Sequence, residues 1–262
     1  MERNTEDREF EKWCDTRNNE KAEKACKKTV EFIVLIRGRN CKKTIVKCLR
    51  SLKRQTYPYW RAIIALDAPT DGSYEFVKDL IFNDDCFAMV CRDKHFGLCK
   101  NMYCIIGDAD RLFKPEKDAV AAILDADDYL AKRAFETVAK KYVRYPEIKI
   151  THGSYMKVSK NKRTKVSKAY PKSGDIRKLP WRGSHLKTIK WDVIVQIRMK
   201  WFIYKEAWLE AASDLALMFG CVDIVGLSKV KHIHDIIYYW NDNVTKKKRI
   251  VQKRCEKILR AK

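Results

Sequence analysis

Three carboxylates stand close together at the end of an apolar run near the middle of the chain. Residues 120–130 read Val-Ala-Ala-Ile-Leu-Asp-Ala-Asp-Asp-Tyr-Leu, so Asp125, Asp127 and Asp128 follow directly on five apolar residues. A continuous apolar run with polar ends is typical of a strand buried on both faces of a parallel sheet. Ligands of open α/β sheets bind at the carboxyl ends of such strands. Clustered carboxylates at this edge are suited to hold Mg²⁺ or Mn²⁺ against phosphate groups.

The first interpretation is therefore a metal-assisted site for a phosphorylated substrate. The residues alone leave a second interpretation open, in which Asp125 and Asp127 cap the helix that follows, since aspartate is a favoured N-cap residue. A calcium-binding EF-hand is disfavoured because no glycine stands at the turn position and no acidic residue closes the loop.

The composition indicates one large folded domain with an excess of basic residues. The chain has 262 residues, of which 46% are hydrophobic, and this is enough to bury a sizeable core. The 56 Lys+Arg residues outnumber the 34 Asp+Glu residues, which gives a formal net charge of +22. Such an excess indicates an anionic partner, which would be a nucleotide, an acidic acceptor, a membrane surface or nucleic acid.

The cysteine pattern and the lengths of the apolar runs predict the cellular location of the protein. The ten cysteines include no Cys-x-x-Cys pair, and no His/Cys cluster has zinc-finger spacing. The first residues lack the apolar stretch of a signal peptide, and no apolar run has the length of a membrane span. We therefore expect free thiols and a cytoplasmic location, compatible with peripheral association with an anionic membrane through basic residues.

Hydrophobic periodicity predicts alternating strands and helices in the first half of the chain. Strand-length apolar runs lie at 31–36, 61–66, 87–91 and 120–124. Helical spacing of apolar residues separates them at 45–52, 76–81 and 101–106. This order predicts an α/β fold with a mostly parallel central sheet, right-handed crossovers and helices on both faces.

The pattern is less regular after residue 130. We predict helices over 135–142, 186–197 and 215–219, strands at 148–152, 155–159 and 232–240, and a basic loop or hairpin over 157–178. The resulting division is a charged N-terminal helical arm (1–29), a single domain (30–243) and a basic C-terminal tail (244–262).

Three stretches, in this order and spacing, resemble the family 2 glycosyltransferases, which are nucleotide-sugar enzymes of the GT-A fold. Residues 33–73 carry the strand, the Arg37-Gly38-Arg39-Asn40 turn, the Cys-Leu-x-Ser-Leu-x-x-Gln-Thr-Tyr helix end and the Asp-x-x-Thr-Asp-Gly-Ser turn. Residues 124–130 resemble the family's metal-binding motif. Residues 181–218, with Ser-His-Leu-Lys-Thr and Ser-Asp-Leu-Ala-Leu-Met, resemble acceptor-side elements. The chain departs from the family at Ile36-Arg37-Gly38, where proline is common, and at Asp67-Ala68, where a second aspartate is common.

The resemblance implies an inverting transfer of a sugar from a nucleotide-diphospho-sugar to an acceptor hydroxyl. It implies UDP as the nucleotide and a glycan, a lipid-linked molecule or a protein as the acceptor. Mn²⁺ or Mg²⁺ would neutralise the leaving diphosphate as a Lewis acid. Asp127 would bind the metal directly, Asp125 would lie near the ribose and the metal, and Asp128 would be a neighbour or a helix cap.

On the donor side, the resemblance further places Asp67 at the nucleobase. Asn40, Gly97 and Asn101 would line the nucleotide cleft. From its position alone, Asp67 is equally well explained by turn chemistry.

On the acceptor side, the resemblance makes Asp214 the candidate base that takes the proton of the acceptor hydroxyl, with Glu210 as the fallback. Weaker candidates are His185 near the diphosphate or acceptor, Trp181 against a sugar ring and His234 as a third metal ligand. Residue type alone favours a helix cap for Asp214 and structural roles for the histidines and the tryptophan.

Two other classes of function are weighed against this one. A nucleic-acid-binding protein would cluster its basic residues on one face, whereas here they are spread along the chain without a known binding motif, so nucleic acid is not the expected partner. A nucleotidyltransferase would share the metal carboxylates and the α/β core, but Arg37-Gly38-Arg39 is a poor match to a glycine-rich phosphate loop. An inactive transferase that serves as a scaffold is not distinguished by sequence.

Overall fold

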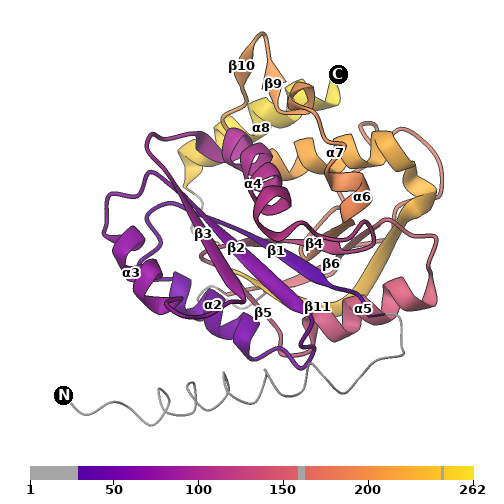
Figure 1. Cartoon of the computed structure of the whole chain (residues 1–262). Coiled ribbons are helices and arrows are strands. Elements are labelled where there is room, and N and C mark those ends of the chain that lie inside the picture. Colours follow the sequence, from indigo (N-terminus) through magenta and orange to yellow (C-terminus); the bar gives the residue numbers. More distant parts are fainter. Residues whose placement is uncertain (1–28, 159–162, 243–244) are drawn as a thin grey trace.

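Nine strands form the central sheet of the part of the chain that this computed structural model describes, residues 29–158, 163–242 and 245–262 (Figure 1). Their order is β3-β2-β1-β4-β8-β6-β11-β5, with β7 paired to β6. The charged arm predicted over 1–29 lies outside the described residues except for its last position.

The first half of the chain has the predicted alternation of strands and helices. The parallel strands are β1 (Phe32–Gly38), β2 (Trp60–Asp67), β3 (Phe87–Arg92) and β4 (Val120–Asp125). The connecting helices are α2 (Ile45–Lys53), α3 (Ser73–Leu80) and α4 (Gly97–Phe113). The predicted α/β fold with a mostly parallel sheet is therefore confirmed.

Strand β1 is apolar because both of its faces are covered. Phe32 and Val34 pack on the face with α2, α3 and α5 (Ala134–Arg144), whereas Ile33 and Leu35 pack on the face with α4. All four side chains are fully buried. At about 25 cal/mol per Å² of apolar surface, burial on both faces makes these strands the main source of fold stability.

The second half adds strands that run in both directions. Its strands are β5 (Tyr129–Leu130), β6 (Ile150–Lys157), β7 (Arg163–Lys165), β8 (Lys187–Lys190) and β11 (Val230–Trp240). Its helices are α5, α6 (Trp191–Ile194), α7 (Ser213–Val225) and α8 (Lys246–Arg260), with the 3₁₀ turns η1 (Met199–Trp201) and η2 (Leu227–Lys229). A separate hairpin joins β9 (Ile203–Tyr204) to β10 (Ala207–Trp208).

The helix predicted over residues 186–197 is wrong. Residues 187–190 form β8, which lies antiparallel between β4 and β6, and only Trp191–Ile194 is helical. Strand pairing overrides the helical spacing because β8 finds backbone partners on both sides in the gap between two strands. The two strands predicted at 148–152 and 155–159 are one continuous strand, β6.

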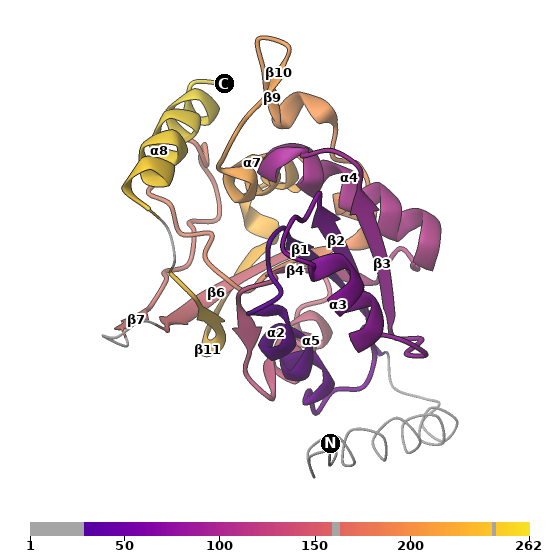
Figure 2. The same ribbon diagram turned by 90° about the vertical axis from the view of Figure 1, so that its left-hand side faces the viewer.

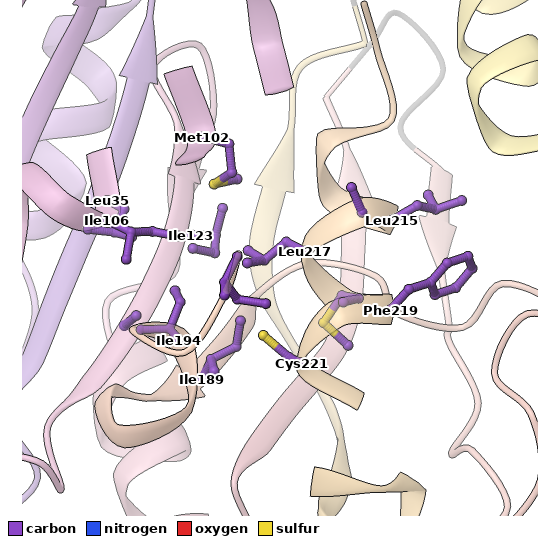
Figure 3. Packing of buried hydrophobic residues seen from close by; sticks show 14 of the residues in the cluster. Leu35, Met102, Ile106, Ile123, Ile189, Ile194, Leu215, Leu217, Phe219 and Cys221 are labelled. Carbon is purple, nitrogen blue, oxygen red and sulfur yellow. The ribbon is translucent and has the colours of Figure 1, made fainter. Parts of the chain in front are cut away.

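A second layer of helices covers the other face of the sheet. Figure 3 shows Met102 and Ile106 of α4 and Leu217 of α7 beside Ile123 of β4 and Ile189 of β8. Helix α8, which corresponds to the predicted basic tail, adds the buried Cys255 and Leu259 to the same cluster. None of the described helices is long and apolar enough to cross a membrane.

Two histidines are buried side by side in the second half of the sheet. His152 of β6 and His232 of β11 are register partners, and their ring centroids lie 5.1 Å apart. His152 is fully buried. Burial, assisted by the neighbouring His232, lowers the pKa of His152 to about 3.

Acid should therefore destabilise the fold through His152. Between the unfolded pKa of about 6.5 and the folded pKa of about 3, the unfolded state binds the extra proton, so stability is lost as pH falls through this range. Chemical denaturation at about pH 7.5 and at about pH 5 gives the free energy of unfolding that the protein loses between these two pH values. This loss should be about 2 kcal/mol smaller in His152→Phe than in wild type. His234→Gln, at an exposed position of β11, is the control. If wild type and His152→Phe lose the same free energy of unfolding between these pH values, His152 is not the cause of the acid sensitivity.

Candidate active site

A cleft of about 1260 Å³ opens at the carboxyl ends of β1, β2 and β4. All but two of the residues singled out in the sequence line it, from both halves of the chain. They are Asn40, Asp67, Gly97, Asn101, Asp125, Asp127, Trp181, His185, Glu210 and Asp214. The exceptions are Asp128 and His234, and His234 is an exposed residue of β11 that the fold does not bring to the cleft.

The acidic motif is held against the end of β1. Arg37 and Asp125 are register partners on neighbouring parallel strands, and the Ala126 amide donates to the Arg37 carbonyl at 2.9 Å. A Cβ on Gly38 would lie 2.8 Å from the Ala126 Cβ, so only glycine allows this close approach. The Arg37-Gly38 sequence therefore sets the position of the carboxylates.

Asp127 presents a carboxylate without a protein cation. It lines the cleft and forms no ion pair within the described residues. Burial and the adjacent charge of Asp125 raise the pKa of Asp127 to about 6. A cation bound here would relieve both effects.

The described residues contain no group of three or more His, Cys, Asp or Glu side chains arranged to hold a metal ion. Asp125 uses Oδ1 for Arg37, and its Oδ2 has no hydrogen bond within the same residues. Asp127 together with Asp125 Oδ2 fits an ion such as Mg²⁺, which is commonly held by one or two carboxylates and completes its shell with phosphate oxygens and water.

Asp128 has a structural position. Its oxygens accept hydrogen bonds from the Tyr238 hydroxyl at 2.5 Å and the Asn241 amide at 2.7 Å, and the residue is 1% exposed. Burial and the charges of Asp125 and Asp127 raise its pKa to about 8. Asp128 thus ties the acidic loop to β11 and is turned away from the cleft.

A buried guanidinium joins the two sides of the cleft. Arg37 donates to Asp125 Oδ1 at 2.6 Å and to Ser213 Oγ at 2.8 Å, and it lies 3.4 Å from Asp214 Oδ1. Ser213 and Asp214 open α7, so Arg37 connects the strand end that carries the acidic motif with the helix that carries the candidate base.

Lys187 forms the second part of this network. Its ammonium, which is 1% exposed, donates to Asp214 Oδ2 at 2.8 Å and to His185 Nδ1 at 3.1 Å. Burial raises the pKa of Asp214, but the charges of Lys187 and Arg37 outweigh it and hold the pKa well below its usual range. Burial and the Lys187 charge lower the pKa of His185 to about 3, so this ring, stacked 4.5 Å from that of Tyr238, is neutral at physiological pH.

Asp67 binds the protein's own backbone at the donor end of the cleft. Its carboxylate accepts from the amides of Phe96 at 2.6 Å and Gly97 at 3.0 Å, and His95 Nδ1 lies 2.8 Å away. Gly97 has a φ of +78°, which favours glycine at the start of α4. The carboxylate predicted at the nucleobase therefore also anchors the turn before α4.

Asn40 and Asn101 take part in hydrogen bonds that shape the same wall. Asn40 Nδ2 donates to Thr70 Oγ1 at 3.1 Å and Asn40 Oδ1 accepts from the Thr70 amide at 2.9 Å, which links the loops after β1 and β2. The buried Asn101 accepts from Arg92 Nε at 3.2 Å. Both residues position backbone at the cleft as well as lining it.

Trp181 and Glu210 line the part of the cleft that the second half of the chain forms. The Trp181 ring is half-buried, and it lies edge-on to Phe219 at 6.2 Å. Glu210 is exposed and paired with Arg254 at 2.5 Å. Trp181 presents an apolar wall, whereas Glu210 is paired at the rim.

The sequence interpretation missed the cations of the cleft. Arg37 was noted only as a departure from the family pattern, and Lys187 only as part of a motif. A cationic residue at the end of an apolar strand was the available signal for Arg37. Six residues of the C-terminal segment, which was assigned as a tail, also line the cleft: Thr245, Lys247, Lys248, Arg249, Val251 and Gln252.

The family model described as Glycosyl transferase family 2 matches residues 33–208 of this chain. The chain belongs to this family. Its fold is that of the GT-A glycosyltransferases, as the resemblance implied. No curated protein matches the sequence.

Solved structures share the fold at low sequence identity. S. aureus TarS 1-349 in complex with UDP has a TM-score of 0.60 and 16% identity, over 88% of this chain and 65% of that chain. The mannosyltransferase PcManGT from Pyrobaculum calidifontis, in complex with GDP-Man and Mn²⁺, has a TM-score of 0.56 and 12% identity, over 89% and 64%. The chain spans 37% of the longer S. aureus TarS structure, with a TM-score of 0.58 and 16% identity over 81% of this chain.

Removing the Arg37 guanidinium should destabilise the protein. Arg37→Met leaves Asp125 and Asp214 without their shared cation, so urea unfolding should show a loss of about 3 kcal/mol. Arg133→Met is the control, because Arg133 forms an exposed pair with Glu136 and its loss should change stability little. Equal stability of Arg37→Met and wild type would show that the network does not support the fold.

Proposed function

We propose that this family 2 chain is an inverting glycosyltransferase that moves a sugar from a nucleotide-diphospho-sugar to an acceptor hydroxyl. One observation carries the proposal: Asp127, which has no protein cation, and Asp214 at the start of α7 line the same cleft at the carboxyl edge of the sheet. Their presence in one substrate-sized space supports a metal-binding role for Asp127 and the role of base for Asp214.

The donor that we propose is a UDP-sugar. TarS has been solved with UDP and with UDP-GlcNAc, and PcManGT with GDP-Man, so related folds accept both nucleotides. We propose UDP because it is the nucleotide that the family resemblance implies. We assign 30–130 to donor binding, since Asn40, Asp67, Gly97 and the acidic motif come from it, and 131–243 to the acceptor.

Asp127, with Asp125, would hold Mn²⁺ or Mg²⁺. When bound, the ion supplies Lewis-acid neutralisation of the leaving diphosphate. The protein's part is to keep Asp125 in place through Arg37 and to keep Asp127 free to bind the ion.

Asp214 would accept the proton of the acceptor hydroxyl. Lys187 and Arg37 keep its carboxylate ionised at neutral pH and fix its orientation, which a base requires, although the same cations weaken its basicity. Glu210 is a poorer candidate because it lies at the exposed rim in a pair with Arg254.

Metal and nucleotide should stabilise the protein together. The melting temperature should rise by several degrees on addition of UDP only when Mn²⁺ or Mg²⁺ is present, because the ion joins Asp127 to the diphosphate. Asp127→Ala should remove this metal-linked rise and leave the melting temperature without ligand close to wild type. Asp85→Ala, which alters an exposed aspartate that does not line the cleft, is the control. A rise that is the same with and without metal would argue against the metal role.

Asp214→Asn should separate binding from transfer. The amide keeps the size of the side chain but cannot take a proton, so UDP binding should remain while turnover of the donor falls by about a hundredfold or more. Calorimetry with UDP and metal-dependent hydrolysis of a panel of nucleotide-sugars measure the two quantities. Glu210→Gln serves as the matched variant at the rim. Full turnover by Asp214→Asn would rule out Asp214 as the base.

A further inference from the structure

The first turns of α8 form part of the cleft wall although they lie outside residues 33–208, which the family model matches. Lys247 and Lys248 line the cleft, while Cys255 and Leu259 further along the helix are buried in the core cluster with residues of α7. Figure 2 shows α8 at one side of the molecule, beside α7. The helix is therefore anchored at one end and presents two ammonium groups to the cleft at the other.

Unlike Arg249 and Arg254 of the same helix, these two lysines have no acidic partner within the described residues. Arg249 is paired with Asp242 at 3.0 Å, and Arg254 is paired with Glu210 at 2.5 Å. Neither Lys247 nor Lys248 forms an ion pair anywhere in residues 29–158, 163–242 or 245–262. Their charge is available to an anion that enters the cleft.

Lys247 and Lys248 line the same cleft as Asp125 and Asp127. The proposed function assigns the metal and the diphosphate to these two carboxylates. A diphosphate held there would share this space with both ammonium groups.

The net charge of the residues at the centre of the cleft is unfavourable for a phosphate ligand. Asp125, Asp127 and Asp214 carry three negative charges and Arg37 and Lys187 two positive ones, so the centre is net negative by one, from 2 − 3. A diphosphate ester is a dianion at neutral pH and would be repelled here. One divalent ion would make the centre net positive by one, and the bound dianion would return it to net negative by one. The two charges of Lys247 and Lys248 would outweigh that remaining negative charge.

Resting on the proposed function, we propose that Lys247 and Lys248 bind the diphosphate of the nucleotide donor, so that α8 completes the donor site. Ammonium groups suit this role because they neutralise phosphate oxygens without demanding a fixed geometry. Their contacts persist with the nucleoside diphosphate that departs, which makes α8 part of the leaving-group site.

The test compares two double variants of one helix by calorimetry with UDP and Mn²⁺. Lys247→Gln/Lys248→Gln keeps the side-chain stems and removes both charges. Lys253→Gln/Lys257→Gln removes the same charge from exposed positions of α8 that do not line the cleft. The first variant should bind UDP about tenfold more weakly or worse, and the second should bind like wild type. Lys247→Arg/Lys248→Arg should restore most of the affinity.

Three results would overturn the proposal, and they separate it from the proposed function. Unchanged affinity of the Lys247→Gln/Lys248→Gln variant shows that these lysines do not contact the nucleotide. An equal loss in the Lys253→Gln/Lys257→Gln variant shows that the effect is the general field of the helix. In both cases wild type still binds UDP and the proposed function stands. If wild type binds neither UDP nor GDP with Mn²⁺, the proposed donor site itself fails.

Discussion

The structure of the cleft depends on one buried guanidinium placed between two carboxylates. Arg37 reaches Asp125 on the acidic loop and Asp214 at the start of α7, and it is itself 7% exposed. Two carboxylates that converge in a poorly solvated space repel each other unless a cation lies between them. The acidic loop and the start of α7 can approach each other because the fold supplies this cation.

The sheet topology brings both central cations to β4. In the parallel register of β1 and β4, Arg37 lies beside Asp125, and in the antiparallel register of β4 and β8, Lys187 lies beside Ile123. Each neighbour of β4 thus contributes one positive charge near the acidic strand end. The insertion of β8 against the direction of β4 is what allows Lys187 to reach Asp214, and hence the two halves of the domain share one charge network.

The sequence predicts those elements of the fold whose signal lies in neighbouring residues. Strands β1 to β4 and the helices between them follow from apolar runs, because burial on both faces leaves a signal in the residues themselves. Strand β8 did not follow, because its state is decided by β4 and β6, which are distant in sequence. The residues that line the cleft were found through the acidic motif and the family resemblance. Their partners Arg37 and Lys187 were missed, because they are paired through contacts between segments that are distant in sequence. The different roles of Asp127 and Asp128 were also hidden, because these adjacent aspartates differ only in the direction that each side chain takes.

The pairing of Arg37 and Lys187 with Asp125 and Asp214 limits which cations of the cleft can bind the phosphates of a donor. Arg37 and Lys187 already have carboxylate partners, so turning either toward a phosphate would leave Asp125 or Asp214 unpaired in a poorly solvated site. Such an exchange is costly compared with the use of cations that have no partner. The sources that remain among the described residues of the cleft are an ion at Asp127, Arg39 and the unpaired lysines of α8. On the proposed function, the ion and the lysines would act on the same diphosphate, so weakening one should increase the dependence of donor binding on the other.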